Sequence, residues 1–509
     1  MATRSRKPLY LTAALSILAL GYFVLEKFDT APSTPEISSD SSLAGKPQTA
    51  TPPPAVSATA DLSIAILPFE NTSADADQDY LSEGISRELF ELLSEIPQLA
   101  LASRGAAFQF KSNAVDAAAA ARELEVAQAL TGSVRKTDGT VQISTRLIRA
   151  EDEAVLWSAS YDRPLQDIFA IQDEIVASVA AALGIQLGAN APQAEVVDPE
   201  AYLLWLQGRY FYDQWGEENF ERAVDANRAA LKIDPNFVEA WASLAVTYLT
   251  QTQSGYREIA YGTALTRDAI DKALAIDPDR ASVLARLAHV QLMIEWDWNG
   301  AAETLERALR VAPNDTRVLG AAAYLASCFG RSDEALGYLE RALAEDPKNP
   351  VTMYNYAEIL HRAGRLNDAT AAYRRLLEIN PQDPGTHTQL AIILLQQNKP
   401  EAAWAELELE TEPQQQAYGR LLALPALGRG NEVDERLEQF IEKNQSWGAY
   451  LIANVYAWHG DQDNAFLWLD HAYQQRAATI THVLLEPTLL GLHDDPRWSE
   501  LLGKLGLQQ

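Results

Sequence analysis

Cysteine is almost absent from this chain of 509 residues, because Cys328 is the only one. A single thiol cannot form an internal disulfide, so the fold gains nothing from an oxidising compartment. Histidine is also sparse, with 7 residues, and no two of them stand at the i, i+4 spacing of a helical metal site. We therefore expect Cys328 to be a buried structural thiol and the chain to hold no metal.

Motifs of common catalytic sites are missing as well. The sequence contains no glycine-rich phosphate loop and no Gly-x-Ser-x-Gly elbow. Isolated histidines within helical segments are typical of packing positions. We expect a protein that is not an enzyme, with no catalytic residue and no cofactor.

Positive charge is scarce. The chain carries 41 Lys and Arg against 70 Asp and Glu, which gives a formal net charge of −29. Sequence-independent binding of nucleic acid relies on basic side chains that neutralise phosphates. We therefore expect no nucleic-acid partner. The one cluster of positive charge lies at the start of the chain, at Arg4, Arg6 and Lys7.

Charge is absent from residues 9–25, directly after this cluster. A helix of that length spans roughly 26 Å, at the short end of what crosses a bilayer. The preceding basic residues predict a cytoplasmic tail at 1–8, a single transmembrane anchor at 9–25 in a bacterial inner membrane, and a periplasmic bulk. The alternative is a cleaved signal peptide, whose apolar region is usually shorter and followed by small residues. Residues 21–25 lack such a small-residue site.

Large apolar residues are rare in residues 26–60, where Pro, Ser, Thr and Ala dominate. Such a segment cannot bury a core and is typical of a semi-extended linker.

Residues 61–190 show the pattern of a mixed-sheet α/β domain. Short β-branched runs predict strands, and apolar stripes with helical spacing predict helices. The strands are expected at 63–69, 98–103, 126–134, 141–148 and 155–161, and the helices at 81–93, 117–124 and 165–183. The order β-α-β-α-β-β-β-α predicts a sheet with parallel and antiparallel pairs.

Several strings in this segment also resemble a known domain. They are Ser-Ile-Ala-Ile-Leu-Pro-Phe-Glu-Asn-Thr-Ser at 63–73, Tyr-Leu-Ser-Glu-Gly at 80–84, Ser-Arg at 103–104 with Phe-Gln-Phe-Lys at 108–111, Leu-Thr-Gly-Ser-Val at 130–134, Leu-Trp-Ser at 156–158 with Tyr-Asp-Arg at 161–163, and Ile-Phe-Ala-Ile-Gln-Asp-Glu-Ile at 168–175. In this order they resemble the TolB-like amino-terminal domain, also called the FlgO-type domain. Departures are small: Ala106 and Ala107 replace the usual small hydroxyl residues, and Ser112 replaces a glycine.

The resemblance has implications for the rest of the chain. In that family the domain usually precedes tetratricopeptide repeats, and it follows a cytoplasmic winged-helix domain or nucleotide cyclase across a single span. Only about eight residues precede the apolar segment here, so we expect neither of those activities. The resemblance to regulators still supports an alternative role, in which the α/β domain binds a small-molecule ligand.

Three prolines recur at one interval in the second half of the chain. Pro313, Pro347 and Pro381 lie 34 residues apart, and each follows an apolar helix end. This period is the signature of the tetratricopeptide repeat, a stacked pair of helices. We expect about eight repeats over 198–485, with an insertion between Tyr248 and Ala264 as a loop or a lengthened helix. A C-terminal cap is expected at 486–509.

The inner face of the predicted all-α superhelix follows from helix geometry. Positions 2, 5, 9 and 12 of a repeat lie on one side of its first helix. We expect these positions to form a groove that binds a protein or peptide partner; the candidate residues are Tyr202, Arg209, Glu239, His289, Arg317, Tyr324, Tyr354, Glu358, His361, Trp447, Tyr450 and Asn454. The alternative is that the Tyr and Trp residues only pack against neighbouring repeats.

Together these features predict a non-enzymatic, membrane-anchored periplasmic scaffold. It would bind a protein or peptide through the repeat groove, in signalling or envelope assembly. The alternative is a ligand-sensing regulatory subunit that acts on a separately encoded transcription factor or adenylate cyclase.

Overall fold

The computed structural model describes residues 62–73, 78–110, 116–137, 139–188, 194, 197–445 and 448–508. The predicted tail at 1–8, anchor at 9–25 and linker at 26–60 lie outside these residues, and so does Trp447. None of the described helices combines the length and the apolar character that a membrane crossing requires.

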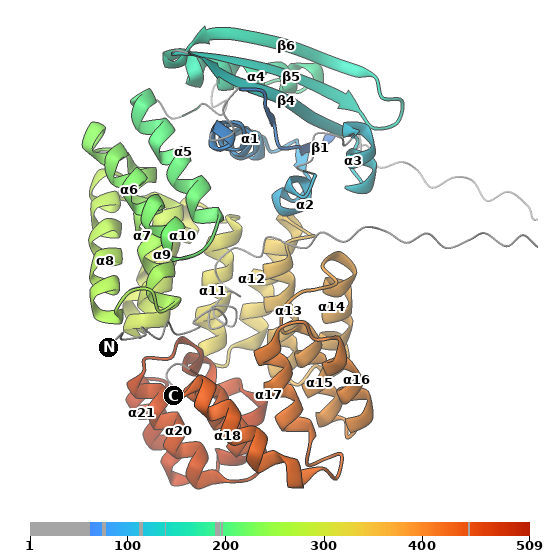
Figure 1. The fold of residues 1–509 in the computed structure, drawn as a ribbon, viewed down its shortest axis with the longest axis vertical. Coiled ribbons are helices and arrows are strands. Elements are labelled where there is room, and N and C mark those ends of the chain that lie inside the picture. Colours follow the sequence, from blue (N-terminus) through green and yellow to red (C-terminus); the bar gives the residue numbers. More distant parts are fainter. Residues whose placement is uncertain are drawn as a thin grey trace, which may run out of the picture.

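An α/β domain begins the described chain (Figure 1). Its strands are β1 (Ser63–Ile66), β2 (Glu70–Asn71), β3 (Ala100–Leu101), β4 (Gln128–Thr137), β5 (Thr140–Arg149) and β6 (Val155–Pro164). Its α-helices are α1 (Asp79–Ser94), α2 (Arg104–Phe108), α3 (Ala117–Glu123) and α4 (Ile168–Ala182). The sheet order is β3-β1-β4-β5-β6; β1 pairs in parallel with β3 and β4, whereas β4–β5 and β5–β6 are antiparallel. The predicted mixed sheet is confirmed.

The two faces of the sheet are covered by different helices. Because side chains alternate along a strand, Ile64 and Ile66 point to one face and Ala65 to the other. The isoleucines share a core with apolar residues of α1 and α4, and Ala65 packs with the alanines of α3. Helix α1 therefore has its apolar stripe on the sheet and its opposite side free to meet the rest of the molecule.

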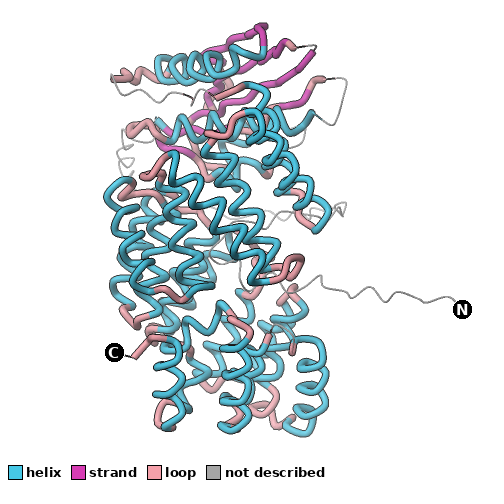
Figure 2. The backbone as a smooth tube through the Cα atoms, turned by 90° about the vertical axis from the view of Figure 1, so that its left-hand side faces the viewer, coloured by secondary structure: helices cyan, strands magenta, loops and turns pink. Residues whose placement is uncertain are grey.

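Paired helices follow the sheet and stack below it (Figure 2). They are α5 (Pro199–Asp213), α6 (Glu217–Ile233), α7 (Val238–Gln253), α8 (Ile259–Ile276), α9 (Ala281–Val290), α10 (Trp298–Val311), α11 (Thr316–Cys328), α12 (Ser332–Glu345), α13 (Pro350–Arg362), α14 (Leu366–Ile379), α15 (Thr386–Gln396), α16 (Pro400–Leu409), α17 (Pro413–Ala423), α18 (Val433–Asn444), α19 (Ala449–Trp458) and α20 (Gln462–Gln474). The predicted helical superhelix is confirmed.

Local sequence explains the helix boundaries in the regular repeats. Proline cannot continue a helix, and Pro313 and Pro347 lie two positions after the last residues of α10 and α12. A capping residue comes two positions later: the side chain of Asp315 accepts from the backbone N–H of Arg317 at 2.8 Å, and that of Asn349 from Thr352 at 3.0 Å. Where the sequence predicts an insertion, α7 and α8 are lengthened to 16 and 18 residues.

The C-terminal segment does more than cover the last repeat. It consists of two 3₁₀ stretches, η7 (Ala478–Leu485) and η8 (Pro487–Leu492), and of α21 (Pro496–Leu505). The indole Nε1 of Trp298 on α10 donates to the carbonyl oxygen of Leu505 at 2.8 Å. One hydrophobic cluster joins residues of α9 to α11 with residues of α19 to α21. The C-terminal helices thus pack against α9 to α11, in the middle of the array.

Candidate functional site

The α/β domain is joined to the first repeats through α1 and α4. Gly84 on α1 lies so close to α5 that an added Cβ would be 2.7 Å from Cδ2 of Leu206. Tyr202 of α5, a predicted groove residue, is buried, and its hydroxyl accepts from Gln172 of α4 at 2.9 Å. A single hydrophobic cluster extends from the sheet to α9. The α/β domain and the first repeats therefore share one core.

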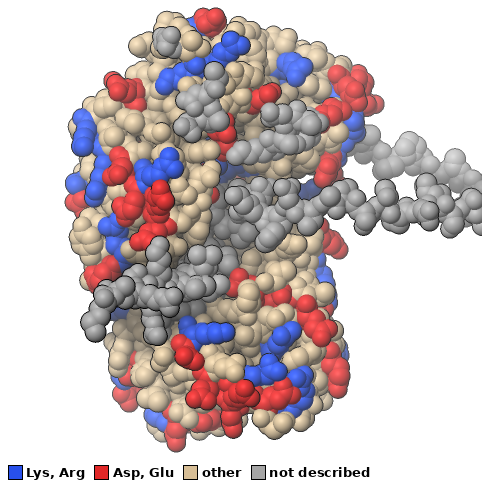
Figure 3. Space-filling model, viewed as in Figure 1, with Lys and Arg blue, Asp and Glu red and all other residues tan. Residues whose placement is uncertain are grey.

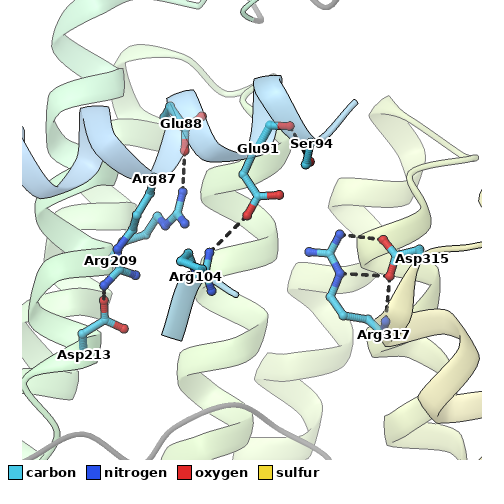
Figure 4. A network of polar contacts seen from close by, with 9 residues as sticks. All are labelled: Arg87, Glu88, Glu91, Ser94, Arg104, Arg209, Asp213, Asp315 and Arg317. Atoms are coloured by element: carbon cyan, nitrogen blue, oxygen red, sulfur yellow. Dashed lines mark hydrogen bonds and ion pairs between the residues drawn. The ribbon is translucent and has the colours of Figure 1, made fainter. Parts of the chain in front are cut away.

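Charged side chains surround this contact (Figure 4). Arg209 of α5, the second predicted groove residue, donates to Glu88 of α1 at 2.6 Å. Arg104 of α2 donates to Glu91 at 3.1 Å. Arg87 of α1 forms an ion pair with Asp213 of α5, and each of these two side chains is only 11% exposed. Burial raises the pKa of Glu88 to about 7, although Arg209 acts in the opposite direction.

A cavity of about 1580 Å³ lies beside this charged contact. Helices α1 and α2 line one side, and α5, α7, α9, α11 and the start of α13 line the other. Its volume exceeds the roughly 300–1,000 Å³ that is usual for a small-molecule site. Four predicted groove residues line it: Arg209, Glu239, His289 and Arg317.

The cavity walls hold further ion pairs. Arg280 lies 2.9 Å from Glu239, and Arg317 lies 2.6 Å from Asp315, with the guanidinium of Arg317 extending toward the centre of the charged cluster (Figure 4). His289 is 8% exposed, and its Nε2 lies 3.4 Å from Nε2 of Gln253. Burial, with a contribution from Arg286, lowers the pKa of His289 to about 3, so its imidazole is neutral at physiological pH.

In the later repeats the inner face is occupied by the chain's own C-terminal segment. Tyr324 of α11 is hydrogen-bonded through its hydroxyl to the hydroxyl of Thr481, and its ring lies 4.2 Å from that of His482. Arg362 donates to Glu358 at 3.0 Å and lies 3.8 Å from Glu486. Residues 478–492 therefore fill the concave side of this half.

The other predicted groove residues of this half are buried or half-buried nearby. The ring of Tyr354 lies 5.7 Å from that of Tyr373. His361 is buried, with Nε2 2.9 Å from the side-chain oxygen of Gln396. Tyr450 and Asn454 of α19 are 4% and 2% exposed, so neither is available to a partner without movement of its surroundings. A partner-binding role for the twelve residues stays a prediction.

Two groups of functional candidates were not predicted from the sequence. One is the charged set on the α/β domain, Arg87, Glu88, Glu91 and Arg104; the other is Arg286 on α9. Repeat positions identify the concave face but not the domain that lies against it. The available signal was the charge of Arg87, Glu88 and Glu91 on an amphipathic helix.

The remaining candidates for chemistry are metal-binding clusters and the thiol of Cys328. Within the part of the chain that the structure describes, no group of three or more His, Cys, Asp or Glu side chains could hold a metal ion. Cys328 is fully buried, and burial raises the pKa of its thiol to about 12, which confirms the predicted structural role.

Family models match both halves of the chain. Tetratricopeptide-repeat models match residues 297–350, 329–387 and 360–424. The model described as the HilA/YgeH-like transcriptional regulator, second domain, matches residues 60–178. The resemblance of residues 61–190 to the TolB-like domain stays a prediction, because the matching model is that of a different family.

Individual relatives cover only parts of the chain. A protein named putative adenylate cyclase 3, from Rhizobium meliloti, is 33% identical over 231 residues, which are 44% of this chain. The match spans only 39% of that relative's length.

Solved structures give weaker likenesses. Pseudomonas aeruginosa pilF aligns with a TM-score of 0.34 at 20% identity, over 42% of this chain and 93% of its own. A tetratricopeptide repeat protein from Parabacteroides merdae aligns with a TM-score of 0.38 at 15% identity, over 50% of this chain and 98% of its own. From the family models and the helix pairs together, the helical part of this chain contains tetratricopeptide repeats.

Proposed function

We propose that this protein is a non-enzymatic scaffold that binds a segment of another protein in the cavity between its α/β domain and its first repeats. The observation that carries this proposal is the cavity of about 1580 Å³ on the concave side, lined by four groove residues. Repeat arrays of this type present concave surfaces to other chains. In the later repeats the concave side is instead in contact with residues 478–492, through Tyr324 and Arg362.

The character of the cavity supports a polar partner segment. Its walls alternate arginines with carboxylates, and Trp205, Tyr212 and Trp215 lie among them. Arginine and aromatic side chains contribute most of the binding energy in many interfaces. Outside the cavity, basic and acidic side chains are interspersed on the face shown in Figure 3.

Site-specific photocrosslinking tests the scaffold role. Gly320 of α11 lines the cavity, and Gly337 of α12 does not; an added Cβ has open space at both positions. A photoreactive amino acid at position 320 in the native host should crosslink a defined protein, and the same residue at position 337 should not. Equal products at both positions, or none at 320, would contradict the proposal.

We place this scaffold in a bacterial inner membrane, with residues 9–25 as the anchor and the described domains in the periplasm. The support is the uncharged run at 9–25 behind a basic tail. Reporter fusions after residue 60 test it: an enzyme that is active only in the periplasm should work there. Activity only of a cytoplasmic reporter would contradict this topology.

A second candidate function is a regulatory subunit that senses a ligand and acts on a transcription factor or an adenylate cyclase. Two matches favour it: residues 60–178 match a domain of a transcriptional regulator, and 231 residues are 33% identical to a protein named putative adenylate cyclase 3. Co-production with neighbouring regulators and cyclases tests it. The activity of at least one regulator or cyclase should depend on the presence of this chain. Unchanged activity of all of them would count against the regulatory role.

A further inference from the structure

Among the residues that the structure describes, Arg286 differs from the other arginines of the cavity because it has no carboxylate partner. Five of them have a carboxylate partner; the pairs are Arg87–Asp213, Arg104–Glu91, Arg209–Glu88, Arg280–Glu239 and Arg317–Asp315. Among the described residues Arg286 makes neither an ion pair nor a hydrogen bond, although it is half-buried and lines the cavity.

The surroundings of Arg286 leave its charge uncompensated. It lies on α9 one helical turn before His289, whose ring is neutral. Burial lowers the pKa of Arg286; Tyr212 acts in the opposite direction, and the guanidinium of Arg317 lowers the pKa further. An arginine nevertheless stays protonated in proteins. A partly desolvated cation without a partner is unfavourable, so an anion at this position would be stabilised.

Neutral polar and aromatic groups line the cavity with Arg286. The hydroxyl of Tyr212 lies 2.9 Å from that of Thr250, and Gln253 is paired with His289, so these side chains already have partners. Trp205 and Trp215 line the same cavity. In a ligand with one anionic group and an apolar body, the anionic group would bind the guanidinium of Arg286. The apolar body would contact the aromatic side chains.

The charge balance selects a single negative charge. Carboxylates outside the five ion pairs, those of Glu95, Glu345 and Asp346, also line the cavity and would repel a polyanion. A guanidinium binds one carboxylate through two parallel N–H···O bonds. We propose that Arg286 is the anchor of a binding site for a small organic monocarboxylate in the cavity between the α/β domain and the first repeats.

Binding of a small acid needs no protein partner, so this site is independent of the proposed scaffold role. Because α1 and α2 form one wall and α5, α7, α9 and α11 the other, a bound acid would lie between the two domains. It would favour their docked arrangement, since a ligand that binds only the folded, docked state stabilises it. Failure of the crosslinking test above and failure of acid binding are therefore separate results.

Benzoate and its uncharged analogue benzamide test the site on the full chain at constant ionic strength. Thermal unfolding and titration calorimetry should show saturable stabilisation by benzoate and none by benzamide. Arg286→Gln should weaken benzoate binding by about tenfold or more, in line with loss of a charged hydrogen-bonded contact. Arg310→Gln, which removes an exposed arginine paired with Glu306 at 2.7 Å, is the matched control and should leave binding unchanged.

Several outcomes would overturn the site. They are equal responses to benzoate and benzamide, no response to benzoate, or full benzoate binding by Arg286→Gln. A stronger response to succinate or inorganic phosphate than to benzoate would overturn the assignment to a monoanion. Arg286→Gln should fold, with a melting temperature equal to or above that of the wild type, because it removes an unpaired charge. If it does not fold, Arg286→Lys replaces it and should bind benzoate more weakly than the wild type; unchanged binding would overturn the site.

Discussion

The two halves of the repeat array differ in what lies on their concave side. In the first half, α1 of another domain stands opposite the repeats and leaves a charged cavity between them. In the second half, the chain's own residues 478–492 fill the space and bury tyrosines such as Tyr324 and Tyr450. At the same repeat positions, Arg209, Glu239 and Arg317 thus line a cavity in one half, whereas Tyr324, Tyr450 and Asn454 are buried in the other.

This difference shows that repeat geometry sets the direction of a side chain but not its environment. Arg317 and Tyr324 lie two turns apart on α11, yet the first extends into the cavity and the second contacts Thr481. The segment that covers each half decides whether its residues can bind anything. Four substitutions test how far the two halves differ.

The largest effect is expected at Arg362, in the half of the array whose concave side is occupied by residues 478–492. Its side chain is 10% exposed and lies between the carboxylates of Glu358 and Glu486. Arg362→Met would leave both buried carboxylates without their counter-charge, although Glu486 keeps its hydrogen bonds from Thr488. Loss of a buried counter-charge costs about 3–5 kcal/mol of unfolding free energy. Urea denaturation measures this. Arg365→Ala, which removes a 48% exposed partner of Asp368, should cost less than about 1 kcal/mol, and equal losses would contradict the account.

A smaller loss is expected at the contact between α1 and α5. Gly84→Val would place side-chain atoms against Leu206, where even a Cβ has only 2.7 Å. Overpacking of this kind costs about 1–3 kcal/mol, measured by thermal or urea unfolding. The control is Gly337→Ala on α12, where nothing lies within 4 Å. It should be neutral or stabilising by about 0.5–1 kcal/mol, and a tolerated valine at position 84 would argue against the docked position of α1.

The charged contact should also depend on pH. The pKa of Glu88 is raised by burial to about 7 from an ordinary value of 4.5. The folded state therefore holds this proton more tightly than the unfolded chain, so the contribution of Glu88 is complete below about pH 4.5 and is lost as pH rises through about 7. Between pH 5 and pH 8, the unfolding free energy of the wild type should fall by on the order of 2 kcal/mol relative to that of Glu88→Gln. A flat difference would contradict the burial of Glu88.

The smallest effect is expected at the contact between α10 and the C-terminal helix α21. Trp298→Phe removes the hydrogen bond from the indole Nε1 to the carbonyl of Leu505 but keeps an aromatic ring in place. We expect a loss of about 1 kcal/mol and faster hydrogen exchange in α21 than in α12. Unchanged exchange in α21 would mean that this bond does not fasten the C-terminus.

Much of the fold was predictable from local pattern. The strand runs near Ile64 and Val141 and the proline period at Pro313, Pro347 and Pro381 depend on neighbouring residues alone, and the structure bears them out. The lengthened α7 and α8 were left open between a loop and a helix, because their sequence lacks a breaker until Gly255.

The site was only partly predictable, because it depends on contacts between distant segments. Arg209 and Glu88 are 121 residues apart in sequence, and Trp298 and Leu505 are 207 apart. No local pattern states that α1 stands opposite α9 or that residues 478–492 fold back onto α11. Likewise, an unpaired arginine such as Arg286 is recognised only when its neighbours are known.

Thiol labelling tests the contrast between the two halves most directly. In the wild type Cys328 should be unreactive, since it is fully buried and its pKa is raised to about 12. With Cys328 replaced by alanine, a maleimide should label Gly320→Cys in the cavity rapidly. It should label Thr481→Cys, at a fully buried position of η7, only as fast as the protein unfolds. Equally rapid labelling at both positions would contradict the division into a cavity half and a filled half.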